Sequence, residues 1–422
     1  MKILVIGSGG REHALCWKIA QSPLCSKLYA APGNDGIKEI AEVLPIASSD
    51  ISSLLDAAQS LAIDLTVVGP DEVLAAGLVD IFMAHGLKVF GPTKNAAKLE
   101  WSKVYSKQFM QRHGIATAAS VTCSTPDEAI NALNSFMYPV VIKADGLALG
   151  KGVIIANDQK KAIAAIHDLF ALGSIASELV IEEYLEGREL SLITLCDGTS
   201  IVPLLPAEDH KQLLNDDKGP NTGGMGAIAP LPWLGISDYN RICEEIVIPT
   251  WQALLTEGID YRGVLYFGLM MTETGPKVLE YNCRFGDPET QVLLPLIKSC
   301  IVQVMLACIA GELNADMIEY HQGFTAGVVL CSKGYPQTPE KGLPICGLDS
   351  LEEGVIPFYA GVRLHKKKLL TNGGRVLCLM AKGDTVTEAL NTIYRNIHKV
   401  QFDGMHYRTD IGNRSKKSAT LN

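Results

Sequence analysis

The stretch KVLEYNCRFGDPETQ, residues 277–291, carries a carboxylate, an amide and a guanidinium at alternate positions. In an extended strand, side chains two residues apart lie on the same face, about 7 Å from one another. We therefore expect a strand with Glu280, Asn282 and Arg284 on one face and the odd-numbered residues on the other. This row of polar groups predicts that one face of the strand borders a ligand site.

These three side chains suit the phosphates of a nucleotide. Glu280 and Asn282 supply the hard oxygen ligands that Mg²⁺ takes when phosphate groups also hold it. Arg284 can stabilise a phosphoryl group in transfer or an acyl phosphate. A buried ion pair is the alternative, but such a set on one face needs solvent or a ligand to satisfy it. Further on, Asp287 and Pro288 are expected as the N-cap and first residue of a helix.

A second phosphate candidate lies upstream in VVIKADGLALGKGV, residues 140–153. It is not a Walker A loop, because only three residues separate Gly146 from Gly150 and no Ser or Thr follows Lys151. Lys143 follows apolar strand residues, so we expect its ammonium group to project toward phosphates as a point charge. A plain glycine-rich hairpin is the alternative.

Two further stretches surround this candidate site. In VIEEYLEGRELS, residues 180–191, the residues Glu182–Leu185 can form a linker whose backbone meets an adenine edge, and Glu189 can accept from ribose hydroxyls. In EDHKQLLNDDKGPNTGGMGAIAP, residues 208–230, the glycines can present N–H groups to an anion and Asp209 can orient an amine. An acidic loop and a mobile surface loop are the respective alternatives.

The first loop, GSGGREH at residues 7–13, begins like a dinucleotide-binding fingerprint. Glu12 occupies the third glycine position, and the second strand ends in YAAPG without the acidic residue that a ribose needs, which disfavours NAD. A helix N-terminus with free N–H groups and Arg11 beside it remains, and it suits a single phosphate. A tight strand-to-helix turn is the alternative.

Composition narrows the class of protein. The 422 residues suggest two to four domains, and the net charge of −9 argues against nucleic acid as the main partner. Eleven cysteines without a CxxC pair indicate reduced thiols and a cytoplasmic location. The start MKILVIGSGG is expected to be a strand rather than a signal peptide, and residues 292–311 a helix packed in the core rather than a membrane span.

The order of apolar runs predicts the organisation of the chain. Short runs alternating with helical stretches in residues 1–100 indicate an open parallel sheet, with one helix at 72–85. A helix pair at 101–135 is expected before the next strand. Two more local features are expected, a hairpin turn at TETG, residues 272–275, and a hairpin at Asn372-Gly373.

Together these stretches resemble the ATP-grasp superfamily and, within it, the phosphoribosylamine–glycine ligase family. The resemblance rests on VIGSGGREHAL, APGNDG, VVGPD, FGPT…AAKLEWSK, VVIKADGLALGKGV, VIEEYLEG, DHK…GPNTGGMGA, LYFGLM, KVLEYNCRFGDPETQ and TNGGRVL, in the family's order over nearly the whole chain. GPNTGGMGA and RFGDPETQ make the set specific. The chain departs from the family pattern at Asp71, Glu208 and Gln212 and in a short segment before LVIEE.

The resemblance implies an α/β fold in three parts. Residues 1–102 would form an N-terminal open-sheet domain that receives phosphoribosylamine, and residues 103–322 an ATP-grasp domain. Within it, residues of about 120–187 would form a small mobile lid, and residues 323–422 a C-terminal α+β domain. The implied ligands are ATP, Mg²⁺ or Mn²⁺, glycine and 5-phosphoribosylamine, with neither nucleic acid nor membrane as partner. We expect a monomer or a weak dimer.

The site residues follow by position. Those expected to act in catalysis are Lys143, Asp209 and Arg284, and those expected to hold the metal are Glu280 and Asn282. The expected ATP contacts are Lys103, Lys143, Gly150, Lys151, Glu182, Glu183, Tyr184, Leu185 and Glu189. The expected substrate contacts are Gly9, Gly10, Arg11, Glu12, Asn34, Asp209, Lys211, Gly223, Gly224 and Arg284.

The implied reaction joins glycine to 5-phosphoribosylamine through glycyl phosphate, in purine biosynthesis, without a covalent protein nucleophile. Another ATP-grasp carboxylate–amine ligase, or a carboxylase or transformylase of the purine pathway, is the first alternative. A nucleotide-binding regulator without turnover and an NAD reductase are the others. Glycine-dependent release of ADP separates the first two classes from the proposed ligase.

Overall fold

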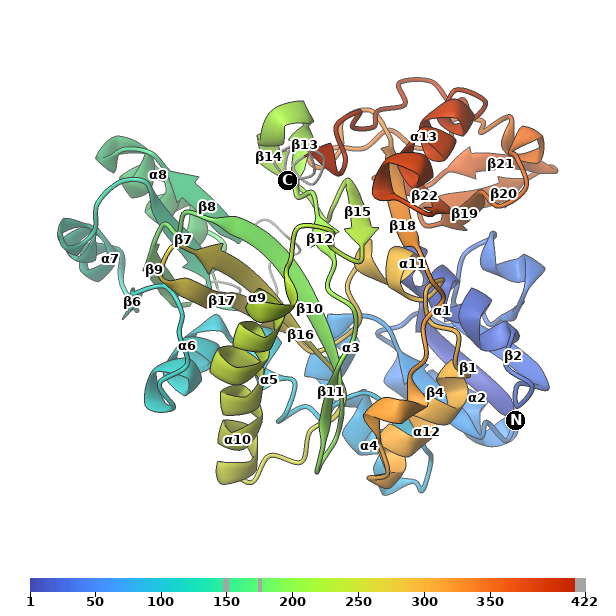
Figure 1. Cartoon of the computed structure of the whole chain (residues 1–422), viewed down its shortest axis with the longest axis horizontal. Coiled ribbons are helices and arrows are strands. Elements are labelled where there is room, and N and C mark those ends of the chain that lie inside the picture. The colour runs from blue at the N-terminus through green and yellow to red at the C-terminus, as the bar shows by residue number, and fades with distance from the viewer. Residues whose placement is uncertain (147–151, 174–176, 414–422) are drawn as a thin grey trace.

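The protein, seen in a computed structural model that describes residues 1–146, 152–173 and 177–413, begins with a five-stranded parallel sheet (Figure 1). Alternate residues of its central strand enter two separate cores, since Leu4 and Ile6 belong to one and Ile3 and Val5 to the other. Both faces are therefore buried, as in sheets built from strand–helix–strand units. The expected open parallel sheet is confirmed.

The strand order of this sheet is β3-β2-β1-β4-β5. The strands are β1 (Lys2–Gly7), β2 (Lys27–Pro32), β3 (Glu42–Val43), β4 (Leu65–Val68) and β5 (Val89–Phe90). The helices are α1 (Gly10–Ala20), α2 (Ile51–Ser60), α3 (Asp71–Ala76) and α4 (Leu78–Ala84). The single helix expected at 72–85 is split, because Gly77 adopts a left-handed conformation with φ of 87° that ends α3.

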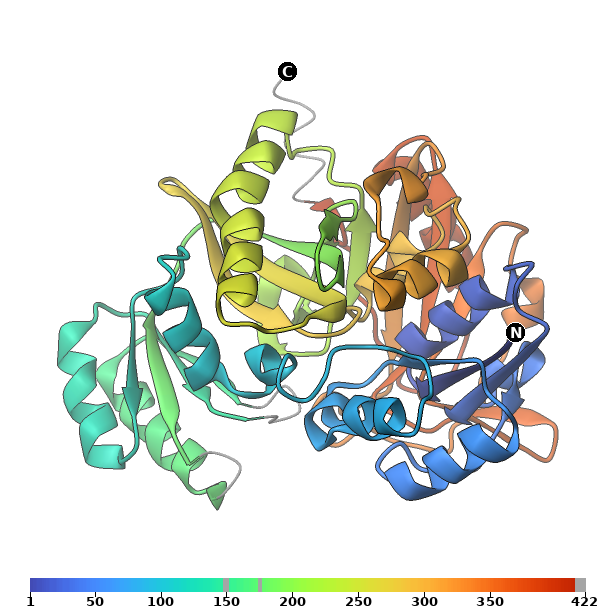
Figure 2. The ribbon, with the colours of Figure 1, turned by 90° about the horizontal axis from the view of Figure 1, so that it is seen from below.

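A small lid follows α5 (Lys98–Trp101) and α6 (Lys103–Arg112). Its antiparallel sheet has the order β6-β9-β7-β8 and a core of its own. The elements are β6 (Ser120–Cys123), α7 (Pro126–Ala132), β7 (Val140–Ala144), β8 (Val153–Ala156), α8 (Gln159–Phe170) and β9 (Leu179–Glu183). β6 interrupts the helix pair expected at 101–135. Figures 1 and 2 both show the lid at the side away from the N-terminal sheet.

The central sheet has the order β11-β10-β16-β17 and is antiparallel. Its strands are β10 (Arg188–Asp197), β11 (Ile201–Pro203), β16 (Arg262–Thr272) and β17 (Gly275–Asn282), and α9 (Ile236–Ile242) and α10 (Ile248–Thr256) accompany it, joined by a π-helical turn. Thr272 pairs with Gly275, which confirms the hairpin turn at 272–275. This sheet carries the predicted polar strand.

The third sheet draws on distant parts of the chain, in the order β12-β15-β18-β22-β19. Its strands are β12 (Glu208–Asp209), β15 (Gly226–Ala229), β18 (Phe324–Cys331), β19 (Ile356–Tyr359) and β22 (Arg375–Gly383), and α13 (Val386–Ile397) packs on it. Two strands thus come from before residue 323. Two ribbons stand apart, β13 (Gln212–Leu214) with β14 (Lys218–Asn221) and β20 (Val362–His365) with β21 (Lys368–Thr371).

Two local expectations in this part of the chain are wrong. Asn372-Gly373 does not close a hairpin, because β21 pairs with β20 while β22 lies between β18 and β19. The helix expected at 292–311 is two helices, α11 (Glu289–Leu293) and α12 (Ile301–Ala310). Short helical turns also occur at Ile37–Glu39, Leu133–Ser135, Asn215–Asp217, Ala315–Met317 and Leu348–Ser350.

In the described part of the chain, no helix combines the length and the apolar character needed to cross a membrane. All eleven cysteines are free.

Candidate functional site

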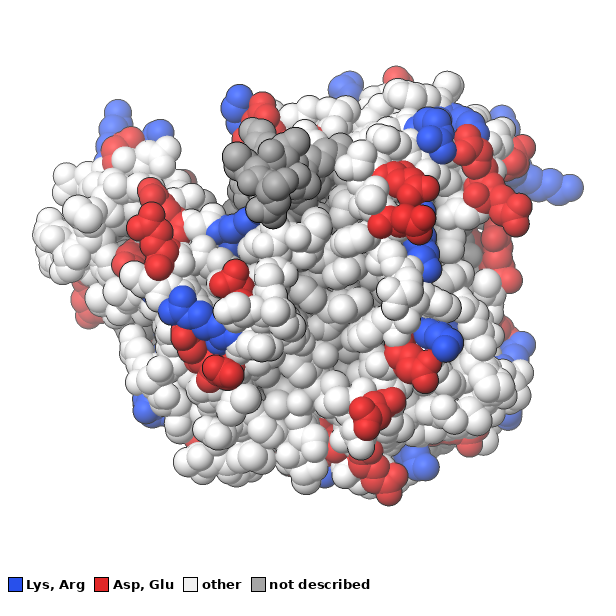
Figure 3. All heavy atoms as spheres, in the orientation of Figure 1, with Lys and Arg blue, Asp and Glu red and all other residues white. Residues whose placement is uncertain are grey.

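A cleft of about 1240 Å³ lies where the lid, the central sheet and the third sheet meet. Its walls combine residues of α6, β8 and β17, the loop around 209–223 and Arg375 of β22. Figure 3 shows a notch between the lid and the rest of the molecule, on a face where basic and acidic side chains are interspersed. The cleft collects most of the residues that the sequence singled out.

The β17 side of the cleft carries Glu280, Asn282 and Arg284, which all line it as expected. The strict alternation expected for the strand is wrong. Leu269 pairs with Val278 and Gly268 with Glu280, so Leu279 is an extra, bulged residue without a partner on β16. Leu279 consequently also faces the cleft, and its carbonyl accepts a hydrogen bond from Lys143 Nζ at 3.0 Å.

The carboxylate of Glu280 lies among cations. Its burial would raise the pKa, but the ammonium groups of Lys211, Lys143 and Lys103 lower the pKa of Glu280 to about 2. Lys211 Nζ is 3.6 Å from Glu280 Oε1. Glu280 is therefore ionised at neutral pH and, with the amide oxygen of Asn282, fits the donor set of a hard divalent cation.

Arg284 is anchored by a carboxylate that the sequence did not indicate. Its Nη2 lies 2.9 Å from Oε1 of the buried Glu100 and donates to Asn282 Oδ1 at 3.0 Å. Arg284 Nε has no hydrogen-bond partner. Burial raises the pKa of Glu100 to about 7, although Arg284 opposes the rise. Glu100 falls inside the quoted stretch AAKLEWSK, where only Lys103 had been singled out.

Lys143 belongs to a buried group of three charges. Glu182 is only 2% exposed, and its carboxylate oxygens lie 2.9 Å from Lys143 Nζ and 3.1 Å from Lys107 Nζ. Burial, aided by the charge on Lys143, lowers the pKa of Lys107 to about 8. The side chain of Glu182 thus holds two lysines in the cleft wall. From the sequence, only the backbone of Glu182 was expected to take part in the site. Lys107 was missed altogether.

Of the other residues expected to contact ATP, the structure describes Lys103, Glu183, Tyr184, Leu185 and Glu189. Lys103 Nζ donates to the carbonyl of Gly146 at 3.2 Å, and Lys103 and Tyr184 line the cleft. Glu183 pairs with Lys277 at 3.1 Å, and Leu185 is buried. Glu189 does not line the cleft, and its Oε1 lies 2.5 Å from Lys211 Nζ. Gly150 and Lys151 lie outside the described residues.

Asp209 presents a carboxylate to the cleft. Its Oδ1 has no hydrogen-bond partner, and burial together with the charge on Glu289 raises the pKa of Asp209 well above its usual range. Glu289, which the sequence did not indicate, accepts hydrogen bonds from Ser191 Oγ at 2.8 Å and from the Tyr266 hydroxyl at 3.0 Å. An unpaired carboxyl group with a raised pKa is suited to exchange a proton with a ligand.

The glycines of the neighbouring loop serve close packing. A Cβ on Gly224 would lie 2.7 Å from Asp209 Oδ1, and one on Gly223 would lie 3.0 Å from the Arg375 guanidinium carbon. The N–H of Gly223 donates to the Tyr335 hydroxyl and that of Gly224 to Thr222 Oγ1. These two N–H groups are therefore not free for an anion, contrary to expectation.

The expectation of free N–H groups at the start of α1 is wrong for Gly9. Its N–H donates to Glu12 Oε2 at 2.6 Å, while Glu12 Oε1 lies 2.6 Å from Arg11 Nε. Arg11 lines the cleft, whereas Gly10 and Glu12 line neither of the cavities described here. The Asn34 amide is occupied too, since it donates to two backbone carbonyls and accepts from two N–H groups.

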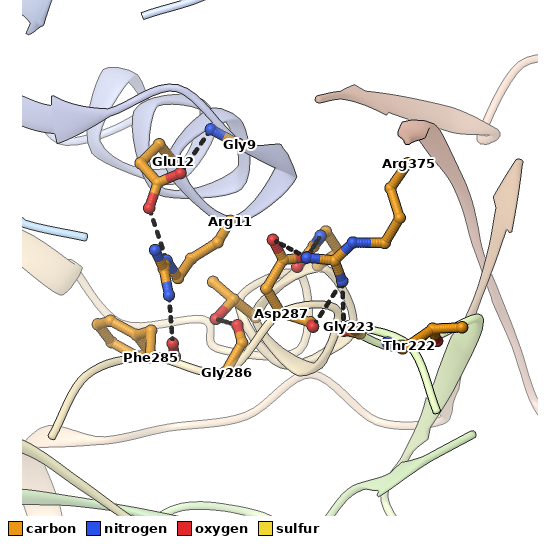
Figure 4. Close-up of polar contacts among 12 residues, drawn as sticks. Gly9, Arg11, Glu12, Thr222, Gly223, Phe285, Gly286, Asp287 and Arg375 are labelled. Atoms are coloured by element: carbon orange, nitrogen blue, oxygen red, sulfur yellow. Dashed lines mark hydrogen bonds and ion pairs between the residues drawn. The ribbon is translucent and has the colours of Figure 1, made fainter. Parts of the chain in front are cut away.

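Asp287 and Arg375, which both line the cleft, form an ion pair (Figure 4). Arg375 Nη2 lies 2.9 Å from Asp287 Oδ2, and its Nη1 donates to the carbonyls of Asp287 and Gly223. The expected N-cap role of Asp287 is wrong, because Pro288 occupies that position and caps no N–H with a side chain. Figure 4 shows Arg11 facing the same loop from α1.

A second cavity of about 500 Å³ adjoins this ion pair, and both Asp287 and Arg375 line it. Its remaining walls come from the N-terminal domain and from residues around β20, and they include Gly9, Asn34, Lys38 and Arg363. The two cavities thus share a wall, and basic side chains from both ends of the chain surround the smaller one.

Comparison with protein families matches three models in sequence order. They describe the N domain of phosphoribosylglycinamide synthetase at residues 1–100, its ATP-grasp (A) domain at 101–290 and its C domain at 325–414. The phosphoribosylamine–glycine ligase of Halalkalibacterium halodurans is 46% identical over 98% of this chain and 97% of its own. The trifunctional purine biosynthetic protein adenosine-3 of Gallus gallus is 45% identical over 98% of this chain and 42% of its own.

Solved structures agree with these matches. The crystal structure of phosphoribosylamine–glycine ligase from Thermotoga maritima is 38% identical, with a TM-score of 0.85 over 97% of this chain and all of that one. The biotin carboxylase–beta-gamma-ATP complex from Campylobacter jejuni has a TM-score of 0.74 over 96% of this chain and 92% of that one. At 17% identity, the second match shows the fold alone.

Proposed function

The chain belongs to the phosphoribosylglycinamide synthetase family, and from that membership we propose how its cleft performs the family's reaction. The reaction is the ATP-dependent ligation of glycine to 5-phosphoribosylamine in purine biosynthesis, which gives glycinamide ribonucleotide, ADP and phosphate. The observation that carries the proposal is that Glu280, Asn282 and Arg284 line one cleft together with Lys143 and Asp209.

In the first step, the carboxylate of glycine attacks the γ-phosphate of ATP and forms glycyl phosphate. Such transfers depend on positioning and charge neutralisation, so no protein nucleophile is needed. Lys143, held between Glu182 and the Leu279 carbonyl, supplies one fixed cation, and Arg284, held by Glu100, supplies another. The unpartnered Nε of Arg284 is a donor for the transferring group.

The metal of the reaction would be held by Glu280 and Asn282. A Mg²⁺ ion bound there, or Mn²⁺ in its place, would neutralise charge on the phosphates. The low pKa of Glu280 keeps its carboxylate ionised for this purpose, because three ammonium groups surround it.

In the second step, the amine of phosphoribosylamine attacks glycyl phosphate. We assign Asp209 as the group that receives the proton from this amine as the amide forms. The support is its unpartnered Oδ1 at the cleft. Burial raises the pKa of Asp209, which makes its ionised carboxylate a stronger base than an exposed one. The charge on Glu289 raises that pKa further.

The phosphate of phosphoribosylamine would occupy the second cavity. Lys38, Arg363 and Arg375 provide cations there, and the cavity shares Asp287 and Arg375 with the cleft. A substrate held in this way would place its amine toward Asp209. Of the residues expected to bind this substrate, Gly9 and Asn34 line that cavity and Arg11 the cleft.

The same proposal has four further parts. They are the division into domains at residues 102 and 322, the lid movement, the cytoplasmic location and a monomeric or weakly dimeric state. The free cysteines support a reducing compartment. The separate core of the lid supports its movement as a unit that keeps water from glycyl phosphate.

The experiment is an assay of ADP release with ATP and Mg²⁺, in which glycine and phosphoribosylamine are each omitted in turn. Full turnover should need both, and hydroxylamine should trap glycyl phosphate when glycine is present alone. If bicarbonate or formate supports the release of ADP and glycine does not, the ligase mechanism is rejected.

A further inference from the structure

The segment of residues 406–412, which follows α13, lies along the β13–β14 hairpin, residues 212–221. His406 Nε2 lies 2.9 Å from the Leu213 carbonyl oxygen. Asn215 and Thr409 exchange two hydrogen bonds, of 2.7 and 3.0 Å. In Figure 1, the red part of the chain after α13 approaches β13 and β14. Two parts of the chain nearly 200 residues apart thus form one continuous contact.

Arg408 is the centre of this contact. It is 1% exposed, and its Nη1 donates to the Gln212 carbonyl and to Asp217 Oδ1, both at 3.1 Å. Its Nε and Nη2 donate to the two oxygens of Asp410, each at 2.8 Å. The Tyr394 hydroxyl, from α13, donates to the carbonyl of Arg408 and ties the segment to that helix. The guanidinium makes four hydrogen bonds at once, whereas an ammonium group has only three donors.

The turn of the hairpin depends on these partners. Asp216 and Asp217 adopt φ of 58° and 51°, a left-handed conformation that non-glycine residues adopt at a cost. The N–H of Asp216 donates to Asp410 Oδ2 at 2.8 Å, and the carboxylate of Asp217 accepts from Arg408. Contacts from residues 408–410 therefore hold two consecutive residues in a conformation that the turn alone would populate little.

The same hairpin forms part of the cleft wall. Asp217, Gly219, Pro220 and Asn221 line the cleft, and the chain continues from them to Gly223. Lys103 and Lys143, which are assigned to ATP, come from α6 and β7 instead, outside the hairpin. A shift of the hairpin would thus change the side of the cleft next to Asp209 and Arg375 first.

We propose that Arg408 is a positioning residue for the ligase reaction, which holds the hairpin 212–221 in the conformation that forms the substrate side of the cleft. The proposal rests on the assignment of that side to glycine and phosphoribosylamine. The segment 406–412 then determines the affinity for these two substrates and not the affinity for the nucleotide. This segment is remote in sequence from every residue assigned to ATP.

The test combines Arg408→Gln, Arg408→Lys and Asn215→Ala in the full chain. Asn215 is exposed, so its substitution loosens the contact without leaving a buried charge, and it carries the test if Arg408→Gln does not fold. The matched control is Asn314→Ala, an exposed asparagine that caps a turn outside the contact. The measurements are amide hydrogen exchange of residues 212–221 and separate KM values for glycine, phosphoribosylamine and ATP.

We expect Arg408→Gln to accelerate exchange in the hairpin and to raise KM for glycine or phosphoribosylamine ~10-fold or more, with KM for ATP within about twofold of the wild type. Arg408→Lys should be intermediate, Asn215→Ala weaker in the same direction, and Asn314→Ala unchanged. Unchanged exchange in the hairpin, or faster exchange with all three KM values unchanged, would overturn the proposal. Absence of glycine-dependent ADP release in the wild type would instead reject the proposed mechanism, and the exchange data would still judge the role of Arg408.

Discussion

Arg375 Nη2 lies 2.9 Å from Asp287 Oδ2, and this ion pair joins β22 of the third sheet to the loop that follows β17. The same guanidinium donates to the carbonyls of Asp287 and Gly223. Three segments that line the cleft therefore meet at one side chain, and the pair also lines the second cavity. This arginine therefore borders both the cleft proposed for phosphoryl transfer and the cavity proposed for the phosphate of phosphoribosylamine.

Replacing Arg375 by alanine should raise KM for phosphoribosylamine ~10-fold or more and affect KM for ATP much less. The variant removes a cation from the second cavity and leaves the Asp287 carboxylate without its partner. Arg375→Lys should recover only part of the loss, because an ammonium group cannot reach the carboxylate and both carbonyls in the planar arrangement. Arg395→Ala, which removes an exposed arginine of α13, is the control. An increase confined to KM for ATP would place the residue in the nucleotide site instead.

Replacing Glu280 by alanine should lower kcat by ~100-fold or more, because it removes the proposed carboxylate ligand of the metal and leaves the neighbouring ammonium groups unbalanced. Glu280→Asp should retain more activity and require more Mg²⁺. The measurement is a titration of ADP release with Mg²⁺ for both variants. Near-normal turnover of the alanine variant at saturating Mg²⁺ would contradict the assignment.

The sequence predicted which residues line this site better than it predicted the contacts that they make. The alternation in residues 277–291 placed Glu280, Asn282 and Arg284 in the cleft, because a strand has a fixed side-chain period. The bulge at Leu279 was not predicted, since one unpaired residue in a strand leaves no mark in the local pattern. Yet that bulge turns the Leu279 carbonyl to Lys143.

Pairings between distant segments were beyond the reach of pattern arguments. Glu100 with Arg284 and Asp287 with Arg375 are partners that only the folded chain brings together. Asp287 was assigned to a helix cap because Asp-Pro before a helix is a frequent local signal. The tertiary ion pair prevailed over that preference. The prediction of a hairpin at Asn372-Gly373 is wrong for a similar reason, because β22 pairs with β18 and β19.

Replacing Asp209 by asparagine should separate the two chemical steps. Glycyl phosphate formation, followed as glycine hydroxamate in the presence of hydroxylamine, should stay within about fivefold of the wild type, while amide formation falls ~100-fold. The reason is that asparagine keeps the shape of the side chain and cannot accept the proton of the amine. Asp238→Asn, an exposed change on α9, is the control. Equal loss of both steps would assign Asp209 to the first step or to the fold.

Stability should fall as the solution is acidified from neutral pH, and His13 should account for part of the fall. His13 is a buried residue of α1 that contacts β19, where its Nδ1 accepts the N–H of Tyr359 at 2.7 Å and its ring stacks on that of Tyr359. Burial lowers the pKa of His13 from 6.5 to about 4. His13 is therefore protonated below about pH 6.5 in the unfolded chain, but only below about pH 4 in the folded protein. Between pH 7 and pH 5 this difference should cost about 2 kcal/mol of the free energy of unfolding.

The measurement for His13 is urea unfolding of the wild type and of His13→Gln at pH 7 and pH 5. Glutamine keeps an acceptor near the Tyr359 N–H and does not titrate, so the variant should lose less stability than the wild type over this interval, whatever its stability at pH 7. His365→Gln, at an exposed histidine of β20, should leave the pH dependence unchanged. If His13→Gln and the wild type lose stability in parallel, the proton is taken up elsewhere. His210, which burial likewise gives a pKa of about 4 and whose Nε2 accepts the N–H of Gly412, would then be the next histidine to replace.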